Sequence, residues 1–214
     1  MQWTHLLAML SLAPSRATRV LADTNGDKPM SAQLQNVLIV CVMLGFALME
    51  FVTRRYQATV RATSDDTKLE LLQFLALLAI AQPTALLVTN QLCLKFMPEQ
   101  HNALAGLPWW AMFGVLLLAD DLTHYLWHRA SHSPMLWPLH RAHHTAQYMS
   151  IRITYRNNFF YYLLMPGLWI GGVLIFLGFG KVYGLYIVRK LVVILGAHCA
   201  WRWDEPLYRV KALR

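Results

Sequence analysis

The sequence predicts an all-α fold: an integral membrane bundle of about four to five helices with a cytoplasmic, histidine-rich helical cap. Of the 214 residues, 57% are hydrophobic and only 14% are charged. A soluble domain carries about a quarter charged residues, and the mean hydropathy here is +0.36. Four long apolar stretches approach or exceed the roughly 20 residues that a membrane-spanning helix needs.

The N-terminal segment, residues 1–30, is expected to lie outside the membrane domain. A secretory signal has basic residues before its apolar run. The short apolar run here, from Leu6 to Ala13, has none before it. We therefore expect an interfacial or disordered lead-in, followed by one membrane domain over residues 31–214. The three cysteines have no paired spacing, so they indicate neither a disulfide framework nor a thiolate metal site.

The apolar stretches predict the membrane helices in chain order. The first covers residues 35–52, and the second covers residues 69–96 with a kink expected at Pro83. The third runs from Leu107 to His128. The last, residues 159–201, is punctuated by glycines, so it is expected to form one span, two short helices or a helical hairpin.

Charge predicts the orientation of this bundle. Four basic residues fall in the connection 53–68 and none in 97–106, and the histidine-rich segment with its sequel carries four arginines. By the positive-inside rule, the histidines and the 53–68 connection lie on the cytoplasmic side. The net charge of +8 is attributed to anchoring against anionic membrane lipids. No nucleic-acid partner is expected, because no soluble basic domain accompanies the charge.

Six of the nine histidines lie within residues 124–144, and their spacing is helical. His124, His128 and His132 follow at i, i+4 and i+8, and Asp121 shares their helix face. Pro134 and Pro138 are expected to interrupt that helix. A second helical segment would then present the remaining histidines at i, i+3 and i+4, namely His140, His143 and His144.

Neutral imidazole is a common metal ligand, so this pattern predicts a metal centre. Five or six imidazoles exceed the four ligands of one tetrahedral zinc and suit two metal ions. Imidazole binds iron, copper, zinc and nickel, so the ligands alone do not select the metal. Asp121 would be a ligand or an acceptor for a histidine N–H. The alternatives are a bis-histidine haem, a histidine-lined transport path, or ordinary interfacial histidines, the interpretation we give to His5 and His101.

The boxes HRASH, residues 128–132, and HRAHH, residues 140–144, resemble those of the fatty acid hydroxylase / sterol desaturase superfamily. A Leu-Trp pair and prolines between the boxes and a preceding hydrophobic helix complete the resemblance, which covers about residues 70–205. It implies a membrane-bound non-haem di-iron enzyme that uses O₂ to hydroxylate or desaturate a lipid C–H bond. It also implies a separate electron donor of the reductase, cytochrome or ferredoxin type. The ligands it implies are His128, His132, His140, His143 and His144, with His124, His198 and Asp121 as second-tier candidates.

The sequence departs from the family pattern near its C-terminus. Members close the site with a further HxxHH box, whereas here HCAWRWDEPLYRVKALR follows from His198, and Arg202 stands where some members carry a histidine. We therefore expect either a fragment of a hydroxylase or an incomplete site. The alternative function is an inactive or degenerate membrane metal-binding protein, in which zinc can substitute for iron.

Overall fold

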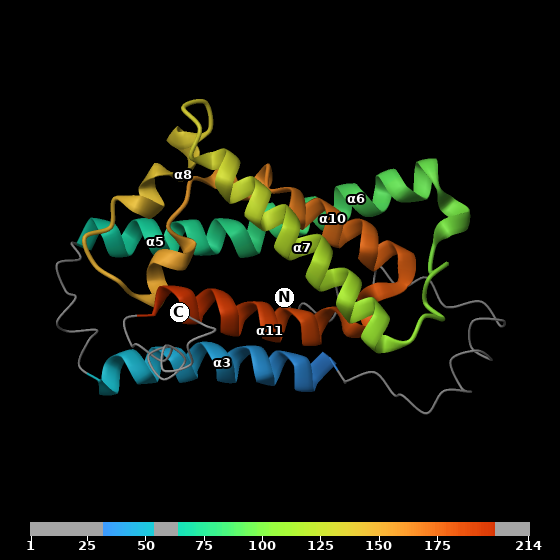
Figure 1. Ribbon diagram of the computed structural model, residues 1–214, viewed down its shortest axis with the longest axis horizontal. Coiled ribbons are helices and arrows are strands. Elements are labelled where there is room, and N and C mark those ends of the chain that lie inside the picture. The colour runs from blue at the N-terminus through green and yellow to red at the C-terminus, as the bar shows by residue number, and fades with distance from the viewer. Residues whose placement is uncertain (1–31, 54–63, 200–214) are drawn as a thin grey trace, which may run out of the picture.

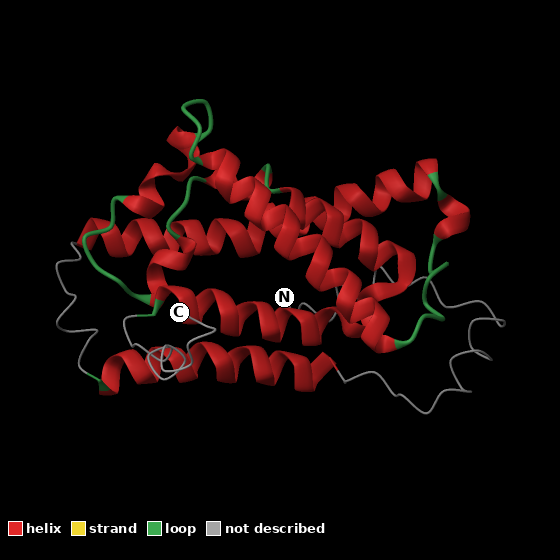
Figure 2. Ribbon diagram, viewed as in Figure 1, coloured by secondary structure: helices red, strands yellow, loops and turns green. Residues whose placement is uncertain are grey.

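The computed structural model describes residues 32–53 and 64–199, which form an all-helical bundle without strands (Figure 2). The expected lead-in at residues 1–30 and the atypical C-terminal residues 200–214 lie outside these ranges. The helices, including π- and 3₁₀-segments marked η, are α3 (Ala32–Val52), α5 (Ser64–Ala76), η1 (Leu77–Ala81), α6 (Gln82–Phe96), η2 (Pro98–Gln100), α7 (Trp109–Ser131), α8 (Trp137–His144), η3 (Ile151–Tyr155), α9 (Phe159–Leu163), α10 (Pro166–Leu174), η4 (Ile175–Phe179) and α11 (Gly180–His198).

Three helical stretches are long and apolar enough to cross a membrane: Gln33–Val52, Asp65–Phe96 and Phe159–His198. This supports a membrane protein, although the span expected at residues 107–128 is not among the three. That segment does form a helix, α7, but Asp120, Asp121 and the histidines lower the hydropathy of its second half. Of the four to five predicted spans, three stretches are therefore supported among the described residues. The last of these stretches reverses direction at Gly178.

The kink expected at Pro83 takes the form of a π-helical segment. Pro83 has no N–H and would clash with the carbonyl four residues earlier in a regular helix. The chain instead forms the π-segment Leu77–Ala81 just before the proline, where the backbone N–H of Gln82 bonds to the carbonyl of Leu77. The extra residue in the turn accommodates the proline, so α5, η1 and α6 continue as one stretch.

The last apolar region folds back on itself at Gly178, as one of the expected alternatives predicts. Gly178 has a φ of 112°, which side chains rarely adopt. A Cβ there would lie 2.8 Å from the backbone nitrogen of Ala105. The N–H of Asn102 bonds to Phe176 O at 3.0 Å, so the loop before α7 is fastened to this reversal. Figure 1 shows the result: α10 and α11 run in opposite senses, and α11 lies beside α3.

Two ion pairs hold α7 against α11. Lys190 lies 2.8 Å from the carboxylate of Asp120, and Arg189 lies 2.8 Å from that of Asp121. The Asp120 pair is largely enclosed, since the aspartate and lysine side chains are 11% and 19% exposed. These pairs fix the helix that carries His124 and His128 relative to the helix that ends at His198.

The enclosed ion pair gives a stability prediction. Lys190→Met should lower the free energy of unfolding by about 3–5 kcal/mol, because it leaves the Asp120 carboxylate unpaired inside the bundle. Lys68→Met is the matched control: Lys68 pairs with Asp65 at 3.0 Å, but both side chains are at least 75% exposed, so its loss should cost less than about 1 kcal/mol. Unfolding in detergent micelles measures both, and equal effects would contradict the prediction.

Candidate metal centre

Three helix ends bring the predicted histidines together at one end of the bundle. α7 supplies its last turns, the short α8 follows after a break at residues 132–136, and α11 ends nearby. The break confirms the predicted interruption, and Pro138 lies in the first turn of α8, where its missing N–H costs nothing. Ring nitrogens of four histidines all lie within 4.8 Å of one another: His128, His132, His140 and His144.

His140 is the most enclosed member of this four-histidine cluster, with 1% of its surface exposed. Its Nδ1 lies 2.8 Å from Oδ1 of Asn157, and its Nε2 lies 2.9 Å from Nε2 of His144. The Nε2 atom therefore points into the cluster while Nδ1 is held from outside. His132 and His144 are exposed, so the cluster is closed toward the bundle and open on its other side.

His143 and His198 form a pair beside the cluster. Their Nε2 atoms lie 3.2 Å apart. Nδ1 of His143 lies 3.0 Å from the carbonyl of Ile153, and Nδ1 of His198 lies 2.7 Å from that of Ile194. A carbonyl only accepts hydrogen bonds, so both Nδ1 atoms carry the proton and donate it. If both rings are neutral, neither Nε2 carries a proton, and the lone pairs of the two Nε2 atoms point at each other.

Burial keeps the three imidazoles of α8 neutral. Loss of hydration, reinforced by neighbouring histidines, lowers the pKa of His140 to about 4 and that of His143 to about 3. The pKa of His144 is also lowered, first by burial and then by His132. At neutral pH the α8 histidines therefore present lone pairs rather than protons, which is the form that binds a metal ion.

The distances between these nitrogens fit a shared cation. Zinc–nitrogen bonds are about 2.0–2.1 Å, so two imidazole nitrogens on one tetrahedral ion are about 3.4 Å apart and on an octahedral one about 3.0 Å. The Nε2–Nε2 separations here are 2.9 and 3.2 Å. His144 can donate an N–H to His140, but His143 and His198 have no proton left to share. A cation between them satisfies both lone pairs, so the residues present fit a metal.

Residues 150–157, the segment after α8, position the histidines through hydrogen bonds. Carboxylates of α3 and α5 bind this segment in turn. Glu50 accepts bonds from the hydroxyl of Ser150 and the N–H of Ile151, both at 2.8 Å. Glu70 receives Arg152 at 2.7 Å. Both glutamates are at most 5% exposed. The same segment, residues 150–157, contains the Ile153 carbonyl and the Asn157 amide that contact the histidines.

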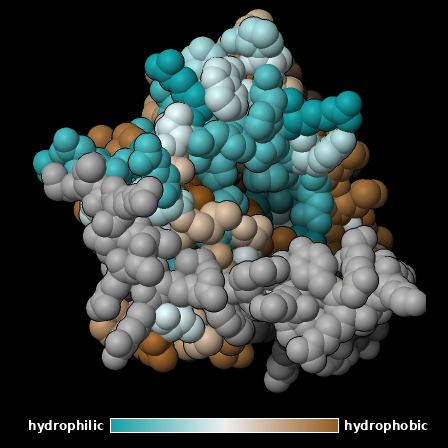
Figure 3. All heavy atoms as spheres, turned by 60° about the vertical axis from the view of Figure 1, so that its left-hand side comes forward, coloured by the Kyte–Doolittle hydropathy of each residue, from teal (hydrophilic) through white to brown (hydrophobic). Residues whose placement is uncertain are grey.

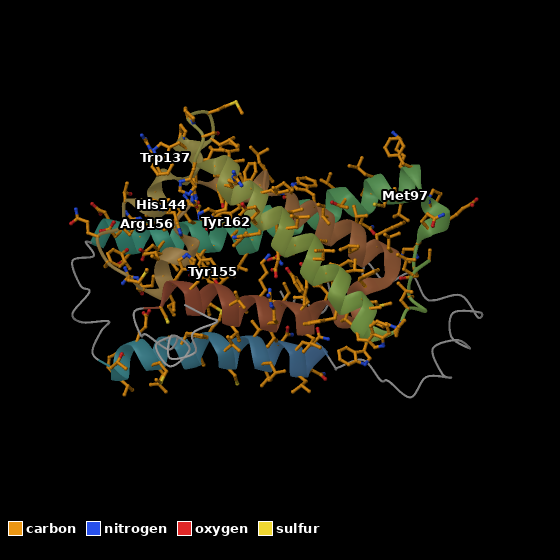
Figure 4. The ribbon with its side chains drawn as sticks, in the orientation of Figure 1. Met97, Trp137, His144, Tyr155, Arg156 and Tyr162 are labelled. Atoms are coloured by element: carbon orange, nitrogen blue, oxygen red, sulfur yellow. The ribbon has the colours of Figure 1, made fainter. Side chains whose placement is uncertain are left out.

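Arg156 joins this support to α8 itself. Its Nε donates to the carbonyl of Ala142 at 2.9 Å, and its Nη1 pairs with Asp66 of α5. Figure 4 places Arg156, Tyr162 and His144 at the same end of the molecule and Met97 at the opposite end. In Figure 3, hydrophilic residues gather on that end. The C-terminal end of α3 and the N-terminal end of α5, which flank the 53–68 connection, thus lie at the same end of the bundle as the histidines. The cytoplasmic assignment of that end stays a prediction.

The second-tier candidates lie at different distances from the cluster. His198 reaches it directly through His143. The ring of His124 is 6.4 Å from that of His128, and its buried Nδ1 has no hydrogen-bond partner among the described residues. Asp121 forms an ion pair with Arg189 on α11 and does not contact the four-histidine cluster. His101, which was expected to be an ordinary histidine, packs against Phe176 at the opposite end.

Several residues around the site were not predicted from the sequence. Asn157 contacts His140, and the carbonyl of Ile153 contacts His143. No local sequence motif predicts these tertiary contacts. Trp137 stacks on His144 with the ring centroids 5.6 Å apart. Tyr161 stacks on His140 at 5.0 Å, with ring planes 16° apart. The Leu-Trp pair between the boxes was a usable signal for Trp137, because an aromatic residue beside clustered imidazoles can stack on them.

Comparison with known proteins gives two matches. The family profile described as fatty acid hydroxylase matches residues 113–213. A curated protein, "Fatty acid hydroxylase vlmA" of Lecanicillium sp, is 45% identical over 64 residues. That alignment covers 27% of this chain and only 18% of the relative. No solved structure matches the chain.

The matched range, residues 113–213, includes both histidine boxes, the supporting segment 150–157, and α11 with His198. The identity with the curated relative, although confined to a short segment, points to the same family. Helices of membrane-spanning length and a cluster of histidines at one end of the bundle agree with that assignment. Over residues 113–213, this chain is therefore similar to proteins of the fatty acid hydroxylase family.

Proposed function

We propose that this chain is a membrane-bound, non-haem di-iron oxidoreductase that uses O₂ to hydroxylate or desaturate a C–H bond of a lipid. The observation that carries the proposal is the pair of bare Nε2 atoms, His143 facing His198 at 3.2 Å, beside a cluster of four further imidazoles. The similarity of residues 113–213 to fatty acid hydroxylases supports the reaction type. Fatty acyl chains, sterols and related lipids are the substrate class, and membrane lipids surround the chain.

In this proposal the six histidines divide between two ions. His128, His132, His140 and His144 hold one ion, because their nitrogens already lie within 4.8 Å of one another. His143 and His198 contribute to the second, with His124 in reserve one helical turn before His128. Iron held by these residues would supply the activation of O₂ for attack on C–H bonds that no side-chain acid or base can break.

The chain's own groups have supporting roles in that chemistry. The carbonyl of Ile153 and the amide of Asn157 orient imidazoles from outside the site. The carboxylates of Glu50 and Glu70 hold the segment that carries these groups. The bundle side of the site is closed by Tyr161 and Tyr162, which are at most 5% exposed. Water is therefore excluded from the face of the site toward the membrane helices.

Reduction of O₂ needs electrons that this site cannot generate by itself. We therefore include a separate electron-donor protein, of the reductase, cytochrome or ferredoxin type, in the proposal. Zinc is expected to occupy the same nitrogens when iron is scarce, because imidazole binds both metals. A chain that binds metal without turnover would instead be an inactive metal-binding protein of the same family.

Metal content tests the ligand assignment. The detergent-purified chain should hold about two irons, and His143→Ala should lower the content by about half, because it removes one of the two facing Nε2 atoms. His101→Ala is the matched control, since His101 lies at the opposite end of the bundle beside Phe176. Elemental analysis gives the ratios. Unchanged metal content in His143→Ala would refute the assignment of this histidine.

Turnover separates the enzyme from the inactive metal-binding protein. The iron-loaded chain in lipid nanodiscs, supplied with a chemical reductant and O₂, should consume O₂ and add oxygen to, or remove hydrogen from, an acyl or sterol lipid. Mass spectrometry of the extracted lipids detects the change, and His140→Ala should reduce product at least 100-fold, roughly the loss expected when a metal ligand is removed. Full metal content without any lipid product would favour the inactive alternative.

A further inference from the structure

A buried relay of hydrogen bonds runs from the backbone of the supporting segment to the ring of His140. The hydroxyl of Tyr162 lies 3.5 Å from the carbonyl of Thr154, and the amide nitrogen of Asn157 lies 3.5 Å from that hydroxyl. The amide oxygen of Asn157 lies 2.8 Å from Nδ1 of His140. His140, Asn157 and Tyr162 are all at most 5% exposed, so water does not compete for these groups.

The direction of this relay is set at its first member. The Thr154 carbonyl can only accept, so the Tyr162 hydroxyl donates its proton there and has only lone pairs to offer to Asn157. The NH₂ group of Asn157 must therefore face the tyrosine, which turns its oxygen toward His140. An oxygen acceptor at Nδ1 requires the proton on Nδ1. The remaining nitrogen, Nε2, is then bare and points toward His144 at 2.9 Å.

Two stacked neighbours hold the plane of the His140 ring. Tyr161 stacks on it at 5.0 Å with ring planes 16° apart, and His143 stacks on it at 5.2 Å with planes 18° apart. The ring plane is thus fixed, and in the observed orientation, with Nδ1 2.8 Å from Oδ1 of Asn157, only the position of the proton is left to choose. Resting on the proposed metal centre, we propose that Asn157 and Tyr162 are positioning residues that hold His140 as the Nδ1–H tautomer and so direct a bare Nε2 at the metal.

The alternative role for Asn157 is purely structural, and the two roles differ in what a replacement must supply. A tautomer lock needs an acceptor at the Oδ1 position, whereas a packing role needs only volume. Asn157→Asp keeps an acceptor and nearly the same shape, while Asn157→Leu keeps the volume and removes the acceptor. Gln147→Leu is the matched control, since it removes an exposed amide of the neighbouring loop for which no contact with the site is found among the described residues.

The test is Co²⁺ titration of the full-length chain in detergent, in competition with a chromophoric chelator. Asn157→Leu should weaken Co²⁺ binding about 10–100-fold. Asn157→Asp and Gln147→Leu should bind within about threefold of the parent chain, and Tyr162→Phe should weaken binding about three- to tenfold because the amide is then free to flip. Equal losses in Asn157→Asp and Asn157→Leu, or parent-like binding by Asn157→Leu, would overturn the role of Asn157. Parent-like binding by Tyr162→Phe would overturn that of Tyr162.

A second readout separates this inference from the metal proposal itself. In the metal-free chain labelled with ¹⁵N-histidine, the NMR signals of His140, assigned with a His140→Gln variant, should show a proton on Nδ1. In Asn157→Leu that proton should shift toward Nε2. A parent chain that binds no Co²⁺ would refute the metal centre, and the tautomer spectrum would still decide the roles of Asn157 and Tyr162. An Nε2-protonated His140 in the parent chain would overturn them directly.

Discussion

The structure depends on one constraint: imidazoles that are largely desolvated must be neutral, yet each neutral ring still carries one proton that needs an acceptor. His143 and His198 place that proton on backbone carbonyls, and His140 places it on an amide oxygen. Once the Nδ1 atoms are committed outward, Nε2 of His143 faces Nε2 of His198 at 3.2 Å, and Nε2 of His140 faces His144 at 2.9 Å. Two facing lone pairs such as those of His143 and His198 are unfavourable in an apolar setting unless a cation joins them. The same contacts that keep the rings neutral thus make the site a receptor for metal.

This constraint explains why buried carboxylates lie on helices that carry no histidine. The acceptors for His140 and His143 come from residues 150–157, a segment with little regular structure of its own. Glu50 of α3 and Glu70 of α5 hold it in place, and Arg156 ties it to the last turn of α8. Glutamates of such low exposure would be costly without partners. Their partners are the hydroxyl, N–H and guanidinium groups of the segment, so the membrane helices and the site stabilise each other.

The sequence predicted what depends on local periodicity and missed what depends on tertiary contact. The helix face of His124, His128 and His132, the break before α8 and the reversal near the glycines all follow from residue spacing and backbone conformation. Tyr161 and Tyr162 belong to an aromatic run of a kind typical of a membrane interface, yet both tyrosines are buried, and Tyr161 stacks on His140. Asp121 was placed with the histidines on helical spacing, whereas Arg189, 68 residues away, pairs with it. Neither contact could be predicted from one sequence, because both partners lie on distant elements whose facing is set only by packing.

The two groups of nitrogens differ in a way that matters for the proposed chemistry. Four imidazoles supply every position of a tetrahedral ion, and such closed sites are typical of structural metals. Catalytic sites keep a position for a ligand that does not come from the protein. Among the described residues, His143 and His198 provide only two nitrogens for the neighbouring ion, so this is where an exogenous ligand would find room. Tyr161 and Tyr162 close the bundle side of His140, while His132 and His144 open toward solvent. If the proposed function holds, the reacting end of the lipid should therefore meet the site on the His143–His198 side, and the four-histidine cluster should act mainly to hold its ion in place.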